Sequence, residues 1–204
     1  MTITLHHGDL PERLAGVTSM AIDTEAMGLN SPRDRLCLVQ MSRGDGHVDL
    51  VKIERGQTAA PNLTALLADP AVEKLFHYGR FDMGILAATF GVMPRPVYCT
   101  KIASRLVRTY TDRHGLRELA REIAGEDISK QQQSSDWGAE TLTDAQMSYA
   151  ASDVLHLHKI RRGLDAMLER EGRAELAAKL FAFLPTRVEL DLAGWPDIDI
   201  FAHS

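Results

Sequence analysis

The sequence has very few cysteines, no long apolar run and no excess of positive charge. Only Cys37 and Cys99 occur among 204 residues, which excludes a disulfide framework and fits a reducing compartment. No apolar stretch approaches the ~18 residues that a membrane span needs, and the first ten residues lack the apolar core of a signal peptide. These absences predict a cytoplasmic protein that does not enter a membrane.

The charge balance argues against bulk binding of nucleic acid. Lysine and arginine number 23 against 28 aspartates and glutamates, which gives a formal net charge of −5. A domain that grips long duplexes through their phosphates is typically strongly basic. If this chain acts on nucleic acid, it must therefore use local basic patches and bound cations. Its length suits one domain.

The order of sequence patterns predicts an α/β domain with a mixed central sheet flanked by helices and a helical C-terminal half. The expected strands cover 20–24, 36–41, 47–51, 74–77 and 97–100, with a hairpin turn at 44–46. The expected helices cover 62–68, 81–90, 101–108, 116–124 and 143–163, with helix continuing to 183. The tail 190–201 carries apolar residues that require either this core or another subunit as a partner.

The first acidic motif is Asp23-Thr24-Glu25, on a predicted strand. Side chains two apart on a strand share one face, so the two carboxylates lie side by side. Their mutual repulsion is costly unless a cation lies between them. For this motif alone, a solvated pair at a strand end is the alternative interpretation.

Another motif, running from Tyr149 to Asp153, falls in a predicted helix. Tyr149 and Asp153 are four residues apart and therefore share one helix face. The apolar neighbours Met147 and Val154 predict a packed helix, in which an acid is unusual. The alternative is a solvated Asp153 beside a Tyr149 that packs in the core.

Asp82 lies between these motifs, in the stretch His77-Tyr78-Gly79-Arg80-Phe81-Asp82, where a predicted strand passes into a helix. A carboxylate at that position, taken alone, is best interpreted as a helix N-cap. Beside the other two motifs, a metal ligand becomes the better interpretation.

In this chain order the motifs resemble the three exonuclease motifs of the DEDD superfamily, in the tyrosine-bearing branch typified by ribonuclease D. The histidine-bearing branch would have a histidine where this chain has Ser148. The resemblance covers nearly the whole chain, including 35–40 (RLCLVQ) and 135–137 (SDW), and implies a ribonuclease H-like exonuclease fold. The chain length and the stretches 109–116, 130–137 and 198–204 closely resemble the stand-alone nanoRNase C group.

This resemblance implies one 3′→5′ exonuclease domain over residues 1–204, without the appended helical nucleic-acid-binding domains of ribonuclease D. It implies hydrolysis of short single-stranded RNA, down to dinucleotides, to nucleoside 5′-monophosphates, by a ring-like homo-oligomer such as an octamer. A less length-selective exonuclease on longer RNA or on DNA ends is the alternative within enzymes. A non-catalytic nucleic-acid-binding module is the remote alternative.

Two Mg²⁺ or Mn²⁺ ions about 3.5–4 Å apart would supply the nucleophile and stabilise the attacking and leaving oxygens. These hard cations prefer carboxylate oxygens. The expected metal ligands are Asp23, Glu25, Asp82 and Asp153. Tyr149 completes the expected catalytic set by orienting or helping to deprotonate the attacking water. A phenol with a pKa of ~10 is a poor base alone, so the metal must do most of the activation.

The expected substrate contacts surround these motifs, and they rest on the resemblance. Leu29 would wedge between the terminal bases, although its position alone favours a core or loop residue. His77 and Phe81 would contact the terminal sugar or phosphate, with Phe81 as a core residue the favoured alternative. A polar loop would hold the 5′ phosphate and so measure substrate length, unless Trp137 simply anchors it. The full set is Thr24, Gly28, Leu29, His77, Phe81, Lys130, Gln133, Ser134, Ser135 and Trp137.

Two basic stripes at helical spacing could attract phosphates despite the acidic total. One comprises residues 101, 105 and 108, and the other comprises 113, 117 and 121. Solvated faces paired with Glu118 and Glu122 are an equally good interpretation.

Overall fold

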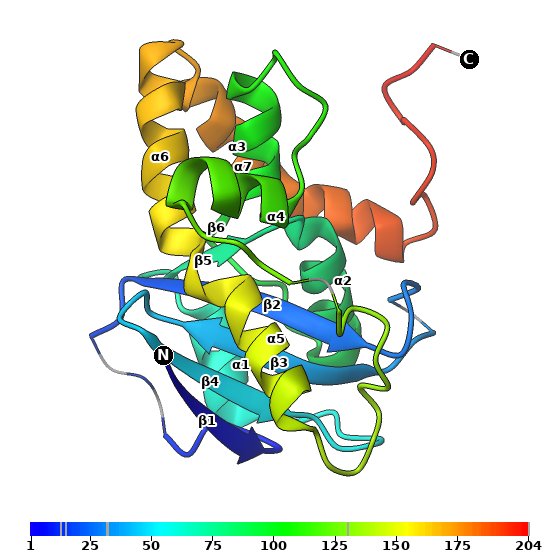
Figure 1. Ribbon diagram of the computed structural model, residues 1–204. Coiled ribbons are helices and arrows are strands. Elements are labelled where there is room, and N and C mark those ends of the chain that lie inside the picture. Colours follow the sequence, from blue (N-terminus) through cyan, green and yellow to red (C-terminus); the bar gives the residue numbers. More distant parts are fainter. Residues whose placement is uncertain (13, 15, 32, 130, 204) are drawn as a thin grey trace.

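A six-stranded mixed sheet runs through the computed structural model, which describes residues 1–12, 14, 16–31, 33–129 and 131–203. The strands lie in the order β1-β4-β3-β2-β5-β6 (Figure 1). β3 pairs antiparallel with both β2 and β4, while the remaining neighbours run parallel. The strands are β1 (Thr2–His7), β2 (Ser19–Ala26), β3 (Leu36–Ser42), β4 (His47–Lys52), β5 (Glu73–Phe76) and β6 (Val97–Cys99).

Helices cover both faces of the sheet and pack on one another beyond it. α5 crosses one face, over β2, β3 and β4, while α2 lies against β2, β3 and β5 on the other (Figure 1). Because helices cover both faces, all seven residues of β3 are buried. The helices are α1 (Pro61–Ala68), α2 (Gly79–Phe90), α3 (Thr100–Val107), α4 (Leu116–Leu119), the π-helical turn η1 (Ala120–Ala124), α5 (Asp144–Leu155), α6 (Leu157–Arg170) and α7 (Ala174–Leu192).

The predicted α/β class, with a mixed sheet and a helical C-terminal half, is confirmed. Each expected strand, and each expected helix before residue 125, lies within two residues of its predicted bounds. The turn at 44–46 joins the antiparallel pair β3 and β4 as expected. β1 was not expected, because its alternating Thr-Ile-Thr-Leu pattern is short and its pairing partner, β4, lies about 40 residues away.

The expectation of one helix over 143–163, continuing to 183, is wrong. α5 ends at Leu155 and α6 begins at Leu157, and a second break at Gly172 (φ +64°) precedes α7. α5 packs on the sheet, whereas α6 packs on α3 and η1. One straight helix could not reach both surfaces, so tertiary packing overrides the continuous helical pattern. None of the helices in the described part of the chain is long and apolar enough to cross a membrane.

The tail after α7 lies along the outside of the molecule (Figure 1). Its start is held by Arg80 on α2, which donates to both carboxylate oxygens of Asp191 at 2.5 and 2.8 Å and to the Pro196 carbonyl at 2.5 Å. Its large apolar residues are nevertheless exposed: Trp195, Ile198, Ile200 and Phe201. The tail therefore does not bury its apolar side chains against this core.

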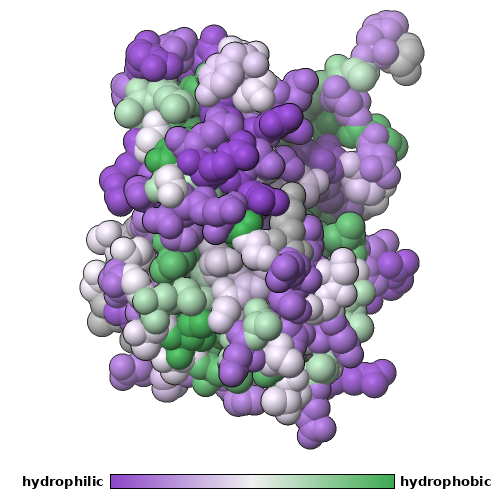
Figure 2. All heavy atoms as spheres, in the orientation of Figure 1, coloured by the Kyte–Doolittle hydropathy of each residue, from purple (hydrophilic) through white to green (hydrophobic). Residues whose placement is uncertain are grey.

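In Figure 2 hydrophilic residues dominate the helical upper part of the molecule, while hydrophobic residues gather over the sheet below.

Candidate active site

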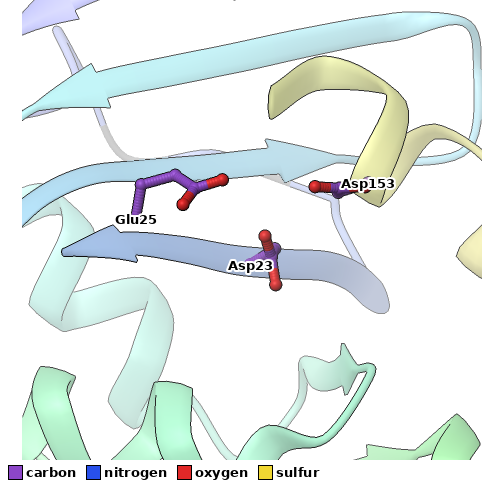
Figure 3. A group of neighbouring side chains, drawn as sticks. All are labelled: Asp23, Glu25 and Asp153. Carbon is purple, nitrogen blue, oxygen red and sulfur yellow. The ribbon is translucent and has the colours of Figure 1, made fainter. Parts of the chain in front are cut away.

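Three carboxylates converge where β2 meets α5. Asp23 and Glu25 project from one face of β2, and Asp153 faces them from α5 (Figure 3). One oxygen of each lies within 4.8 Å of the other two. The pairing of β2 with β3 shifts register directly after Glu25, and such bulges often end a strand beside a functional site. The predicted side-by-side arrangement of the two β2 acids is confirmed.

Asp82 lies beside this cluster, buried on α2. The hydroxyl of Thr24 donates to Asp82 Oδ1 at 2.6 Å, which ties the carboxylate of α2 to β2. α2 begins at Gly79, so Asp82 is the fourth residue of the helix, and no side chain caps the helix start. The interpretation of Asp82 as an N-cap is therefore wrong, and the Thr24 hydroxyl instead holds its carboxylate beside the cluster.

Burial and mutual repulsion oppose ionisation of these acids. Desolvation raises the pKa of Asp23 to about 7, and desolvation followed by repulsion from Asp23 raises the pKa of Asp153 to about 8. The same causes raise the pKa of Glu25 to about 10 and that of Asp82 well above its usual range. A divalent cation reverses this balance because it stabilises ionised carboxylates. A dense set of oxygen donors that resist ionising together fits Mg²⁺ or Mn²⁺.

Gln40 supports the cluster from β3. Its side-chain amide donates to Asp23 Oδ2 at 2.8 Å, and the two residues are direct partners in the β2–β3 register. The side chain is fully buried, so this bond holds Asp23 in one orientation. Sequence reasoning gave Gln40 no role, and only the strand register could have revealed one.

Tyr149 precedes Asp153 by one turn of α5 and lines the same cleft. Desolvation, and then repulsion from Asp153, raises its pKa above that of a free phenol. Its ring lies 6.0 Å from that of Trp137. In the metal-free protein Tyr149 therefore carries its proton at neutral pH, and its hydroxyl is placed to orient a water in the cleft.

Replacing Tyr149 by phenylalanine should lower kcat by about 10²-fold while leaving metal binding in place, because only the orienting hydroxyl is lost. The measurement pairs steady-state hydrolysis with the rise in melting temperature that Mn²⁺ produces. Wild-type kcat in Tyr149→Phe would contradict an orienting role for the hydroxyl.

An open cleft of about 670 Å³ extends from the carboxylates. All the substrate contacts expected from the sequence that the structure describes line it: Thr24, Gly28, Leu29, His77, Phe81, Gln133, Ser134, Ser135 and Trp137. Lys130 lies outside the described residues. The cleft also contains residues that sequence reasoning missed, among them Met27, Tyr78 and Ile128. The structure thus brings the expected residues together, while their individual roles stay predictions.

His77 enters the cleft as a neutral ring. Its Nδ1 lies 2.9 Å from Thr100 Oγ1, and that hydroxyl donates to the Phe76 carbonyl. Nδ1 must therefore carry the proton, which leaves Nε2 as an acceptor. Burial, and then the charge of Lys101, lowers the pKa of His77 to about 3. A neutral acceptor suits a sugar hydroxyl rather than a phosphate.

Leu29 and Trp137 differ in how they are placed. Leu29 is 86% exposed, which excludes a core role, and its side chain stands free at the cleft. Trp137 is buried, and its indole nitrogen has no hydrogen-bond partner among the described residues. Phe81 packs partly against the core, as its alternative interpretation held, and also lines the cleft.

The basic stripes are only partly available to phosphates. Arg108 is fully buried and donates to Glu122 Oε2 at 2.5 Å and to Ser104 Oγ at 3.1 Å. The expectation that Arg108 belongs to a phosphate-attracting stripe is therefore wrong, because its guanidinium is paired with Glu122 inside the helical region. Arg117 lines the cleft, although Asp127 lies 3.4 Å from it.

The sequence of this chain is similar to that of known nucleases. A family described as 3′-5′ exonuclease matches residues 6–169. Ribonuclease D of Acidiphilium cryptum is 38% identical over 86% of this chain and 44% of its own length. Ribonuclease D of Escherichia coli is 31% identical over 84% of this chain and 44% of its own length. The chain thus spans less than half the length of these two relatives.

Solved structures match over a greater length. Brucella melitensis NrnC with bound Mg²⁺ is 57% identical, covers 100% of both chains and superposes with a TM-score of 0.96. The same protein bound to pGG gives 58% identity, full coverage of both chains and a TM-score of 0.97. Escherichia coli RNase D is 28% identical over 88% of this chain and 48% of its own, with a TM-score of 0.76. The chain therefore belongs to the 3′-5′ exonuclease family, in the ribonuclease D group that its motifs resemble.

Proposed function

We propose that this protein is a metal-dependent 3′→5′ exoribonuclease that hydrolyses short oligoribonucleotides, down to dinucleotides, to nucleoside 5′-monophosphates. The observation that carries this proposal is the convergence of the Asp23, Glu25 and Asp153 carboxylates at the open cleft. The full-length likeness to NrnC, a protein solved both with Mg²⁺ and with pGG, supports the substrate class.

Two divalent cations, Mg²⁺ or Mn²⁺, would be held by Asp23, Glu25, Asp82 and Asp153. When bound, such ions supply a water ionised near neutral pH and neutralise charge on the attacking and leaving oxygens. Gln40 and Thr24 hold two of the carboxylates in fixed orientations through their hydrogen bonds. The carboxylates are thus set before substrate arrives, which reduces the reorganisation that catalysis requires.

Other residues of the cleft would orient the RNA. The acceptor nitrogen of His77 suits a hydroxyl of the terminal ribose, and the exposed Leu29 offers an apolar surface to a base. The cleft volume of about 670 Å³ lies within the range of ~300–1,000 Å³ that small-ligand sites occupy. This size favours a short RNA over a long strand. The alternative, a less selective exonuclease on longer RNA or DNA ends, needs a track that continues beyond the cleft.

The test is hydrolysis of 5′-phosphorylated RNAs from two to about twenty nucleotides in the presence of Mg²⁺, with Asp153→Asn as the control. We expect turnover to be fastest on the dinucleotide and to be lost in Asp153→Asn. Comparable trimming at every length would instead support the general exonuclease. Binding of RNA without cleavage at any length would support the non-catalytic module.

The exposed apolar tail supports a homo-oligomer as part of this proposal. We expect light scattering of the wild type to give a multiple of the 22.6 kDa chain mass. Introducing charge with Ile200→Asp and Phe201→Asp should reduce that mass, because both side chains would be buried against another subunit. A substitution at an exposed polar residue, Asp144→Asn, serves as the control. An unchanged mass in the double variant would contradict the role of the tail.

That the 204 residues act as a single exonuclease domain, in the cytoplasm, also remains part of the proposal. Activity of the purified chain with no added protein would support the first point.

A further inference from the structure

A single stretch of chain, residues 133–141, separates two clefts, and we name it the partition. Part of it lines the candidate active site, through Gln133, Ser134, Ser135 and Trp137. The rest lines a second cleft of about 980 Å³, through Asp136, Gly138, Ala139, Glu140 and Thr141. Met27 lines both clefts. The position of the partition therefore sets the width of the active-site cleft on this side.

Three side chains fasten the partition by its backbone carbonyls. Gln146 of α5 donates to the Asp136 carbonyl at 3.2 Å. Arg35, directly before β3, donates to the Gly138 carbonyl at 3.3 Å, and Lys52 at the end of β4 donates to the Glu140 carbonyl. The acceptors are alternate residues, 136, 138 and 140. Lys52 lies on the sheet, Arg35 directly precedes one of its strands, and Gln146 lies on the helix that covers it.

The limb that faces the active site, residues 133–135, is held differently. In the described part of this loop, Ser135 bonds to Gln132 through both its backbone N–H, at 3.0 Å, and its hydroxyl, at 2.6 Å. These bonds remain within the loop and fix nothing to the sheet. The limb is joined to the fastened carbonyls through Trp137, which is buried and whose N–H donates to the Ser135 carbonyl at 3.0 Å.

Only a glycine fits at position 138 without displacing the side chains around it. A Cβ at this residue would lie 2.8 Å from Arg35 Nη2 and 2.6 Å from Met27 Sδ, so any side chain would push both away. Arg35 and Met27 flank the loop that carries Leu29, and the Met27 N–H donates to the Arg35 carbonyl at 2.9 Å. The two loops that border the cleft thus meet at Arg35.

We propose that Arg35 and Lys52 are positioning residues that set the length selectivity of the enzyme. By holding the Gly138 and Glu140 carbonyls, they fix the distance between residues 133–135 and the carboxylates of the active site. A dinucleotide must span that distance with its two ends, whereas a longer RNA has further phosphates to offer. This inference rests on the proposed function.

The test compares kcat/KM for a 5′-phosphorylated dinucleotide with that for a heptanucleotide, both with Mg²⁺. In Arg35→Met and in Lys52→Met the ratio of the two values should fall by about tenfold, through a higher KM for the dinucleotide, as loss of an orienting contact typically does. Arg35→Lys should recover part of the ratio. Arg55→Met is the matched control, because Arg55 lines the same second cleft and makes no hydrogen bond to the partition in the described structure.

A purely structural role predicts a different result, because partial unfolding lowers both values equally and leaves the ratio unchanged. An unchanged ratio in Arg35→Met and Lys52→Met, or a wild type with equal values for both RNAs, would overturn the inference and leave exonuclease activity intact. A wild type that cleaves neither RNA would instead overturn the proposed function.

Discussion

Glu25→Gln should reduce RNA hydrolysis by about 10³-fold or more. Glu25 belongs to the carboxylate cluster, and the charges of Asp23, Asp153 and Asp82 all act on it. The neutral amide keeps the shape of the side chain but loses the charge that a divalent cation requires. Metal-ion catalysis is worth several kcal/mol, and about 4 kcal/mol corresponds to roughly 10³-fold in rate.

The measurement is kcat/KM on a short RNA together with the Mn²⁺-induced rise in melting temperature. In Glu25→Gln, kcat/KM should fall steeply and the Mn²⁺-induced rise in melting temperature should be lost. Glu54→Gln is the matched control, because Glu54 is an exposed glutamate outside the cleft, and it should leave both values unchanged. Wild-type hydrolysis in Glu25→Gln would remove Glu25 from the metal set.

The metal-free protein should lose stability as the pH rises from about 6.5 to 8. Asp23, Asp153 and Glu25 have folded-state pKa values of about 7, 8 and 10, all above those of the unfolded chain. In this window the folded state therefore binds more protons than the unfolded state. By linkage, the free energy of unfolding falls with increasing pH. The loss continues until each group ionises in the folded protein.

The window is chosen so that other buried groups do not mask the effect. The pKa of His77 is lowered to about 3, which makes stability rise with pH only up to the pKa of the unfolded histidine, about 6.5. Burial lowers the pKa of Lys74 to about 8, which makes stability rise with pH only above that value. Between these limits the carboxylates dominate.

The three pKa values together give an expected loss of roughly 4 kcal/mol, or about 10 °C in melting temperature for a chain of this length. Differential scanning calorimetry in EDTA measures it, and added Mg²⁺ should restore more stability at pH 8 than at pH 6.5. Glu25→Gln should flatten the dependence, since one ionising group is gone. A melting temperature that rises across the window in EDTA would contradict the assignment of these acids as a mutually repelling cluster.

Local spacing in the sequence predicts each of the two parts of the acidic site. A spacing of two residues places Asp23 and Glu25 on one face of β2. A spacing of four residues places Tyr149 and Asp153 on one face of α5. Spacing alone could not bring the two faces together. Their convergence was expected only from the resemblance to a family whose motifs occur in the same order.

The features that were missed depend on contacts between distant residues. Gln40 reaches Asp23 only through the register of β2 and β3. Pairing of the basic stripes with Glu122 was one interpretation of the sequence, but helical spacing gives no sign that Arg108 is buried when it makes this pair. The break at His156 exists because two neighbouring helices pack on different surfaces. Patterns within one segment carry none of this information.

A decisive experiment combines a 5′-phosphorylated diribonucleotide, the purified chain and either Mg²⁺ or EDTA, with products separated by chromatography. We expect conversion to two nucleoside 5′-monophosphates with Mg²⁺, no conversion in EDTA, and at least about a 10³-fold loss in Asp153→Asn. Cleavage that persists in EDTA or in Asp153→Asn would contradict metal-dependent hydrolysis at these carboxylates. An intact dinucleotide after incubation with Mg²⁺ and the wild type would contradict the proposed activity.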